Sequence, residues 1–360
     1  MLDIGPQYWT PIFHNILLIV CLITSIKVYY VKIADYGKRS GVPLFFFFIC
    51  VFLFLGLRPL EGGGFGDMYI YLSDFRKYKQ NIFSGTRSDY LWHRYMDISS
   101  KLFSERGFIM SCAFLYVYPL YRSSEMLVGR TRVLLFLMLI ASFSFWPYGT
   151  NGMRNGIATS LFLWAIAANN WKVLRWGLII CSFMIHGSII IPIIGYLVSF
   201  RFKELKYYFI WWLFTIVISL SLGGFVEAFI YNLGYQDERM NYLVQGNIND
   251  DSFRYTGFRW DFLLYSASGV YAGYRYVIRL GYSDENYERF LKIFLVANGL
   301  WILVIRANFS NRFAYLSWFL MAIVIFLPIL KVRLFTNQSL WLSLVTIAYA
   351  GFTYIMYLIS

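Results

Sequence analysis

Long apolar runs separated by short polar connections make up most of this chain. The runs are continuous, without the apolar–polar alternation of barrel strands, and their lengths suit helices that cross a bilayer. The pattern predicts an all-α, polytopic integral membrane protein with about 12 transmembrane helices in one transmembrane domain, residues 1–360. The expected spans are residues 11–31, 43–58, 106–121, 133–149, 153–170, 173–186, 188–200, 207–224, 261–278, 290–306, 312–330 and 338–359.

Two connections are much longer than the others. The first, residues 59–105, begins with a glycine-rich turn and continues with Leu91, Tyr95, Ile98 and Leu102 at helical spacing. This spacing predicts an amphipathic helix on the outer leaflet. The second, residues 225–260, mixes acidic, amide and aromatic side chains, and long loops of this kind often carry function.

The net charge of +13 is distributed unevenly. Nearly all of it lies in one set of short connections, and excess Lys and Arg marks the cytoplasmic side. Both long loops are therefore expected on the outer side of the membrane. Because the charge follows topology, no nucleic-acid partner is expected. A chain that is 59% hydrophobic and only 14% charged is also unlike a soluble domain, where about a quarter of the residues are charged.

Several arginines lie at the outer ends of predicted spans, where the positive-inside rule makes cations less expected. Arg154 is expected in the first turn of its helix. Arg312 is also expected in a first turn, because it follows Ser310, an expected N-cap. Free N–H groups and the dipole at a helix start favour anions, and a guanidinium can bind phosphate oxygens in a bidentate manner. Arg58 and Arg306 each close a span. The alternative for each is an interfacial arginine among lipid headgroups.

Two further groups near the same boundary could move a proton. His186 ends a predicted span, followed by Gly187 as a turn and Ser188 as an expected cap of the next span. Its imidazole could act as a base or as a hydrogen-bond donor. Asp67 follows the glycine-rich turn and could deprotonate a hydroxyl or orient a sugar. The alternatives are a structural histidine and a solvated turn aspartate.

Metal and nucleotide chemistry have no support in the sequence. There is no His/Cys cluster, no HExxH motif and no nucleotide-binding loop, and the four cysteines lie inside apolar runs. We therefore expect no metal and no cofactor.

The ordered set of polar motifs resembles the Wzy-type polysaccharide polymerases, specifically the EpsG-like branch. In this resemblance an arginine at the start of a span is followed about 30 residues later by a His-x-Ser motif. Asn155 departs from the glutamine expected after the arginine. The matching pieces are Arg58 with Gly66-Asp67 and Tyr71, then Arg154-Asn155-Gly-Ile-Ala158, Ile185-His186-Gly-Ser188 with Pro192, and Arg312-Phe-Ala-Tyr315.

The resemblance implies a glycosyltransferase at the periplasmic face of a bacterial inner membrane. It would polymerise undecaprenyl-diphosphate-linked repeat units into O-antigen or a related surface polysaccharide and release undecaprenyl diphosphate. Its partners would be the lipid-linked glycan donor and acceptor and the bilayer, and the sequence leaves open whether a chain-length regulator binds. The implied catalytic residues are Asp67, His186, Arg154 and Arg312, and the implied diphosphate- or glycan-binding residues are Arg58, Tyr71, Asn155, Ser188, Arg306 and Tyr315.

Three other functions compete with this interpretation. A flippase of lipid-linked oligosaccharide would place ionisable groups along a path through the bilayer and often shows internal repeats, whereas here they gather at one face. An O-antigen ligase would use similar chemistry on another acceptor. A membrane acyltransferase would need an acyl-donor entry from the cytoplasm.

Overall fold

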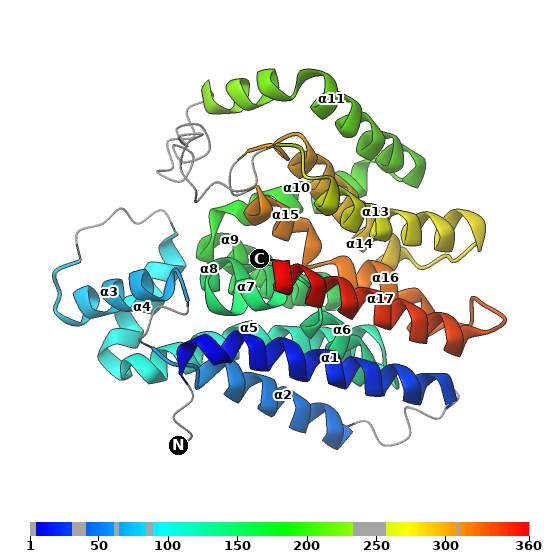
Figure 1. The fold of residues 1–360 in the computed structure, drawn as a ribbon. Coiled ribbons are helices and arrows are strands. Elements are labelled where there is room, and N and C mark those ends of the chain that lie inside the picture. The colour runs from blue at the N-terminus through cyan, green and yellow to red at the C-terminus, as the bar shows by residue number, and fades with distance from the viewer. Residues whose placement is uncertain are drawn as a thin grey trace. The chain divides into compact units, whose positions relative to one another are not determined.

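The computed structural model describes residues 5–30, 41–60, 65–83, 89–232, 257–307 and 310–359, without the side chains of 41–42 and 224–232. Every regular element in these ranges is a helix, as the apolar pattern predicts. The chain forms two compact units, Met1–Ile189 with Phe326–Ser360, and Ile190–Ile325 (Figure 1). They are called unit 1 and unit 2, and each is described by itself.

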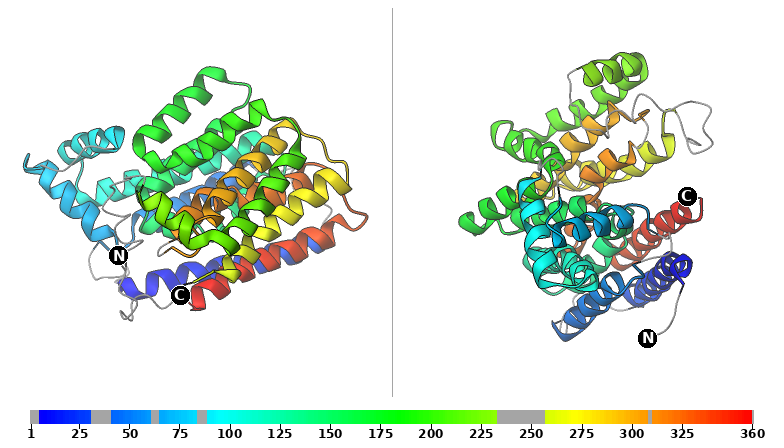
Figure 2. Two further views of the ribbon diagram at one scale, coloured as in Figure 1. Left: turned by 90° about the horizontal axis from the view of Figure 1, so that it is seen from above. Right: turned by 90° about the vertical axis from the view of Figure 1, so that its left-hand side faces the viewer.

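The two terminal helices of unit 1 pair with each other. Helix α1 (Pro6–Tyr30) lies along α17 (Gln338–Ile359), as both views in Figure 2 show. The Ser25 hydroxyl donates to the Ser343 carbonyl at 2.9 Å, and the rings of His14 and Tyr357 stack at 4.4 Å. These polar and aromatic contacts fix one register between two otherwise apolar surfaces.

The centre of unit 1 contains α2 (Gly41–Gly56), α5 (Glu105–Leu127), α8 (Met153–Ala167) and α9 (Lys172–Ile185). Helix α5 packs against both α2 and α8, and α8 packs against α9. This arrangement brings the end of α2 and the start of α8 together, where the candidate site lies.

The predicted span 133–149 is divided between two helices, α6 (Arg132–Ile140) and α7 (Phe145–Thr150). Ser142 and Ser144 lie in the turn between them, and their hydroxyls are 3.0 Å apart. Serine side chains offer local hydrogen bonds that compete with a continuous helix. The Thr353 hydroxyl donates to the Ala141 carbonyl at 2.9 Å, so a neighbouring helix satisfies the interrupted backbone.

The first long connection contains two helices, α3 (Met68–Lys79) and the expected amphipathic helix α4 (Tyr90–Leu102). The buried face of α4 differs from the predicted stripe, because Trp92, Met96, Ser99 and Ser100 are buried whereas Ile98 and Leu102 are exposed. Trp92 packs edge-on against Tyr71 of α3, with ring centroids 5.6 Å apart. The large ring of Trp92, and not the aliphatic spacing, sets the inward face.

Unit 2 is arranged around α14 (Glu285–Ile302), which packs against its neighbours α10, α11 and α15. Asn298 of α14 is fully buried and accepts from Trp212 Nε1 at 2.8 Å, while its amide donates to the hydroxyls of Ser266 and Ser317, each at 2.9 Å. The other elements are α10 (Ile190–Arg201), α11 (Leu205–Asn232), α13 (Trp260–Tyr274), the π-helix η4 (Arg275–Arg279), α15 (Asn311–Trp318) and α16 (Met321–Lys331), whose end belongs to unit 1.

Unit 2 also departs from the predicted boundaries in two places. Helix α11 continues past the expected end at 224 to Asn232, with a kink at Leu222, so the second long connection begins as helix. The predicted span 312–330 is interrupted at residues 319–320, between α15 and α16. Residues 233–256 of the second connection lie outside the described residues.

Length and composition single out four candidate membrane-spanning helices in the described residues: Pro6–Tyr30, Leu205–Gly223, Asn311–Lys331 and Gln338–Ile359. Pro43–Gly56 and Gly187–Arg201 are apolar but shorter. The structure therefore supports a helical membrane protein, while the count of about 12 spans stays a prediction.

Candidate active site

A buried ion pair joins Arg154 to Asp89 in unit 1. Arg154 is the second residue of α8, and its Nη1 donates to Asp89 Oδ2 at 2.9 Å, with side-chain exposures of 16% and 11%. Asp89 directly precedes α4 but does not cap it. Its other oxygen, Oδ1, accepts from the Gly187 backbone N–H at 3.1 Å. One carboxylate thus connects the loop before α4, the start of α8 and the turn after α9.

The turn after α9 fixes the ring of His186. His186 is buried and extended at the end of α9, and its Nδ1 accepts from the Ser188 backbone N–H at 3.1 Å. An Nδ1 that accepts a hydrogen bond carries no proton, so in this arrangement the proton lies on Nε2. This hydrogen bond fixes the orientation of the ring relative to the turn.

Ser188 does not cap the following helix as the sequence predicts. It lies within the 3₁₀ turn η2 (Gly187–Ile189), and its hydroxyl donates to Asn155 Oδ1 at 2.8 Å. This bond joins the His-x-Ser turn to the residue after Arg154. Asn155 thus has a hydrogen-bonding role despite its departure from the expected glutamine.

Arg58 lies next to this cluster and is fully buried. Its Nη1 donates to the Leu55 carbonyl at 2.6 Å, and its Nη2 contacts Met153 Sδ at 3.0 Å. Arg106 donates to the carbonyls of Gly56 and Arg58, so two guanidinium groups occupy the end of α2, where carbonyl groups lack helical partners. No carboxylate of the described residues pairs with Arg58, and its Nε has no hydrogen-bond partner.

Asp67 and Tyr71 lie at the start of α3. Asp67 is half-buried at the N-cap of α3, without a side-chain capping bond. Phe65, in the same turn, lies beneath the Arg58 guanidinium at 5.8 Å from the ring centroid. Tyr71 is buried and close enough to Arg58 to interact with it electrostatically. The glycine-rich residues 61–64 lie outside the described residues.

The remaining predicted residues belong to unit 2. Arg312 is exposed in the first turn of α15, and Tyr315 is buried with its ring 5.7 Å from that of Trp318. Arg306 lies over the Phe258 ring at 5.6 Å. Ser310 occupies the N-cap position, but its hydroxyl donates to the Ile305 carbonyl and does not cap α15. That these residues share a pocket with Arg154 stays a prediction.

Sequence reasoning missed Asp89. An aspartate just before a helix ordinarily caps it, so its position gives no sign of a partner on another helix. The amphipathic helix that follows Asp89 could have indicated this role. Its N-terminus was expected at the same membrane boundary as Arg154, so Asp89 was expected near that boundary too. Within the described residues, no group of three or more His, Cys, Asp or Glu side chains could hold a metal ion.

Comparison with known proteins adds one match. The model of the EpsG family matches residues 41–360, a range that contains every residue of the cluster. The chain belongs to the EpsG family. This is a Wzy-like polysaccharide polymerase family, as the motifs from Arg58 to Tyr315 indicate. No curated protein and no solved structure matches the chain. Membership and the apolar helices together identify a membrane protein of polysaccharide synthesis, and the EpsG assignment makes it an enzyme of the glycosyltransferase type.

Proposed function

We propose that this EpsG-family protein polymerises undecaprenyl-diphosphate-linked repeat units at the periplasmic face of a bacterial inner membrane. The observation that carries the proposal is the buried Arg154–Asp89 pair at the start of α8, beside Arg58. A guanidinium at a helix N-terminus suits the phosphate oxygens of a lipid diphosphate. The outward orientation follows from the distribution of Lys and Arg in the sequence.

In the proposed reaction, a hydroxyl oxygen of the acceptor glycan attacks the anomeric carbon of the donor's reducing-end sugar. The bond from that carbon to the diphosphate oxygen breaks, its electron pair leaves with undecaprenyl diphosphate, and the hydroxyl proton passes to a base. Arg154 and Arg312 stabilise the charge that develops on the leaving diphosphate, and cations can do so without a metal. Arg58 assists through its charge, since its buried guanidinium is bound to the end of α2.

The hydrogen bonds suggest how the proton-transfer roles are divided. His186 Nδ1 accepts from the Ser188 N–H, so its lone pair is not available to take the proton of the acceptor hydroxyl. We therefore assign His186 to positioning, and Asp67 to proton acceptance. Asn155 and Ser188 hold the His186 turn against α8. Tyr71, Arg306 and Tyr315 are assigned to glycan or diphosphate binding.

The test is the length distribution of surface polysaccharide in a deletion strain complemented with variants. Arg154→Ala and Arg312→Ala should each give single repeat units on the lipid core at normal protein levels. Arg130→Ala is the matched control, because Arg130 is exposed on a predicted cytoplasmic connection, and it should give full-length chains. Full-length chains from both Arg154→Ala and Arg312→Ala would remove these arginines from the mechanism.

The same deletion strain separates the alternatives. Loss of all glycan from the lipid core, with polymer retained on its carrier, would identify an O-antigen ligase. Repeat units that accumulate on the inner leaflet would identify a flippase. Only the single-unit phenotype supports the polymerase.

A further inference from the structure

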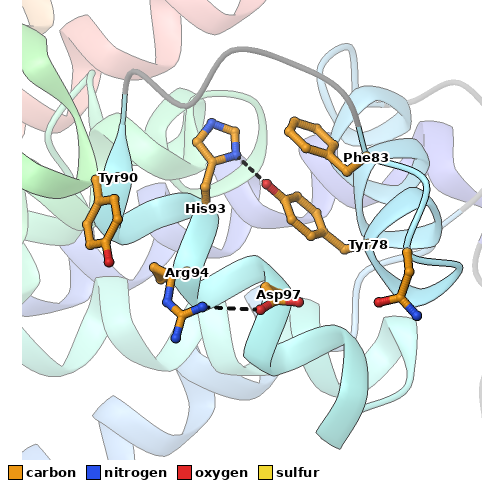
Figure 3. Close-up of a pocket in the computed structure, with 7 residues that line it drawn as sticks. Tyr78, Phe83, Tyr90, His93, Arg94 and Asp97 are labelled. Atoms are coloured by element: carbon orange, nitrogen blue, oxygen red, sulfur yellow. Dashed lines mark hydrogen bonds and ion pairs between the residues drawn. The ribbon is translucent and has the colours of Figure 1, made fainter.

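A cavity between α3 and α4 lies apart from the arginine cluster. Its volume is about 160 Å³, and its walls carry aromatic rings beside an amide, an imidazole and one ion pair (Figure 3). Pockets for drug-sized ligands measure roughly 300–1,000 Å³, so this cavity suits one small ring and not a whole oligosaccharide.

The aromatic side chains of one wall contact each other. The rings of Tyr78 and Phe83 stack with centroids 4.3 Å apart, and the Tyr78 hydroxyl is 2.9 Å from His93 Nδ1. Figure 3 shows Tyr90 at the opposite side of the cavity, and its side chain is 55% exposed. The negative face of an aromatic ring attracts the weakly positive C–H groups of a flat ligand. A pyranose ring presents such C–H groups on one face and hydroxyls at its edge.

The amide of Asn81 is held at the cavity by an unusual backbone conformation. Asn81 has a φ of 57°, and it follows α3 in a turn where Asn81 N–H donates to Tyr78 O and Ile82 N–H to Lys77 O, each at 3.0 Å. This is the hydrogen-bond pattern of a Schellman motif, which glycine or asparagine can form at this position. Unlike glycine, asparagine adds both a donor and an acceptor, which is what hydroxyl groups require.

One carboxylate of the cavity wall, Asp97, pairs with two cations. Arg94 Nη1 lies 3.5 Å from Asp97 Oδ2, and Lys101 Nζ lies 2.7 Å from Asp97 Oδ1. The lining residues thus include one guanidinium and one carboxylate, which together offer donors and acceptors to hydroxyl groups.

We propose that this cavity is a subsite for a single sugar ring of the lipid-linked glycan. The proposal rests on the proposed polymerase function and extends it to glycan recognition. Tyr90, at the cavity, directly follows Asp89, which binds Arg154, and consecutive Cα atoms are only about 3.8 Å apart. A glycan whose diphosphate lies at Arg154 can therefore place a sugar between α3 and α4.

The test measures binding of a lipid-free oligosaccharide, released by mild acid from the strain's own surface polysaccharide, to the full-length protein in detergent. Isothermal titration should give Kd values about tenfold higher for Tyr90→Ala and for Asn81→Gly, because each loses one contact to the sugar. Asn81→Gly keeps the left-handed backbone and removes only the amide. Tyr69→Ala is the matched control, because Tyr69 is also exposed on this pair of helices but does not line the cavity, and it should bind like the unaltered protein.

Three results would overturn the proposal: no oligosaccharide binding by the unaltered protein, unchanged Kd values for both cavity variants, or displacement of the oligosaccharide by inorganic pyrophosphate. The last result would show an anion site. A different experiment tests the polymerase function. If that function is wrong, Arg154→Ala and Arg312→Ala give full-length chains, whatever the oligosaccharide titration shows.

Discussion

Asp89 holds the guanidinium of Arg154 at 2.9 Å, although the two residues are 65 positions apart in the chain. The same carboxylate binds the backbone N–H of Gly187, so the orientation of Arg154 and the conformation of the His186 turn depend on one side chain. Asp89 thus positions groups that we assign to the reaction. This role depends on the carboxylate, since an amide of the same shape has only one acceptor oxygen and no charge to form an ion pair with the guanidinium.

We expect Asp89→Asn to reduce the polymerisation rate by about 100-fold, because a misplaced reactive group can cost that much. The asparagine oxygen can still accept from Gly187, so the turn should persist while Arg154 loses its ion pair. The measurement is the initial rate of chain formation from lipid-linked repeat units in purified protein. Asp74→Asn, which alters a surface pair with Lys77, is the control. An unchanged rate in Asp89→Asn would exclude the positioning role.

We expect Gly156→Ala to destabilise unit 1. A Cβ at Gly156 would lie 2.6 Å from the Tyr148 carbonyl oxygen, so α7 and α8 would have to separate. Overpacking of this kind costs about 1–3 kcal/mol. The matched control is Gly177→Ala on α9, where a Cβ meets nothing within 4 Å and alanine is the better helix former. Thermal unfolding in detergent should show a lower Tm for Gly156→Ala alone, and equal Tm values would contradict the close packing.

We expect Asn298→Ala to destabilise unit 2. The substitution removes one acceptor and two donors, and it leaves Trp212 Nε1 without its buried partner. An unsatisfied buried group costs about 1–3 kcal/mol. Ser268→Ala is the control, because the Ser268 hydroxyl bonds only within its own helix, to the Tyr265 carbonyl. Chemical denaturation monitored by tryptophan fluorescence compares the two variants, and matching midpoints would argue against the network.

We expect the attachment of α3 to α5 to weaken at low pH. The hydrogen bond from Arg76 lowers the pKa of Glu105, at the start of α5, below its ordinary value of 4.5. A lowered pKa stabilises the folded state fully above the ordinary value, and this stabilisation is lost as the pH falls through the folded-state pKa. The protection factors of the α3 amides, which compare their exchange rates with those of an unstructured chain at the same pH, should therefore fall below about pH 4.5.

Glu105→Gln provides the comparison for the pH dependence. The variant cannot titrate at this position, so the protection factors of its α3 amides should be lower at neutral pH and should change less across the acid range. The pair is partly exposed, with side-chain exposures of 48% and 30%, so salt should also weaken it. A pH profile that stays the same in Glu105→Gln would show that other carboxylates dominate.

The sequence predicted helices well where an apolar run was long and lacked serine turns. The first and last spans, 11–31 and 338–359, correspond closely to α1 and α17. The span 133–149 divided because Ser142 and Ser144 form a local turn within an otherwise apolar run. The composition of the run gives no sign that Thr353 satisfies the Ala141 carbonyl there.

The site was predicted in part. Arg154, Asn155, His186 and Ser188 were expected at one boundary, and unit 1 brings them together through hydrogen bonds. The cap proposed for Ser188 was wrong, because its hydroxyl has a better partner on another helix. Asp89 was missed since nothing local distinguishes it from an ordinary N-cap residue.

By itself, the sequence determined that this chain is a helical membrane protein of the EpsG family with arginines at helix starts. Hydrophobicity, helix-end chemistry and motif order are local properties, so they can be read along the chain. Only the tertiary structure decided that Asp89 binds Arg154, that Trp92 faces inward from α4, and that a cavity forms between α3 and α4. These features depend on how side chains from distant segments pack, and packing chooses one partner among many that local patterns allow.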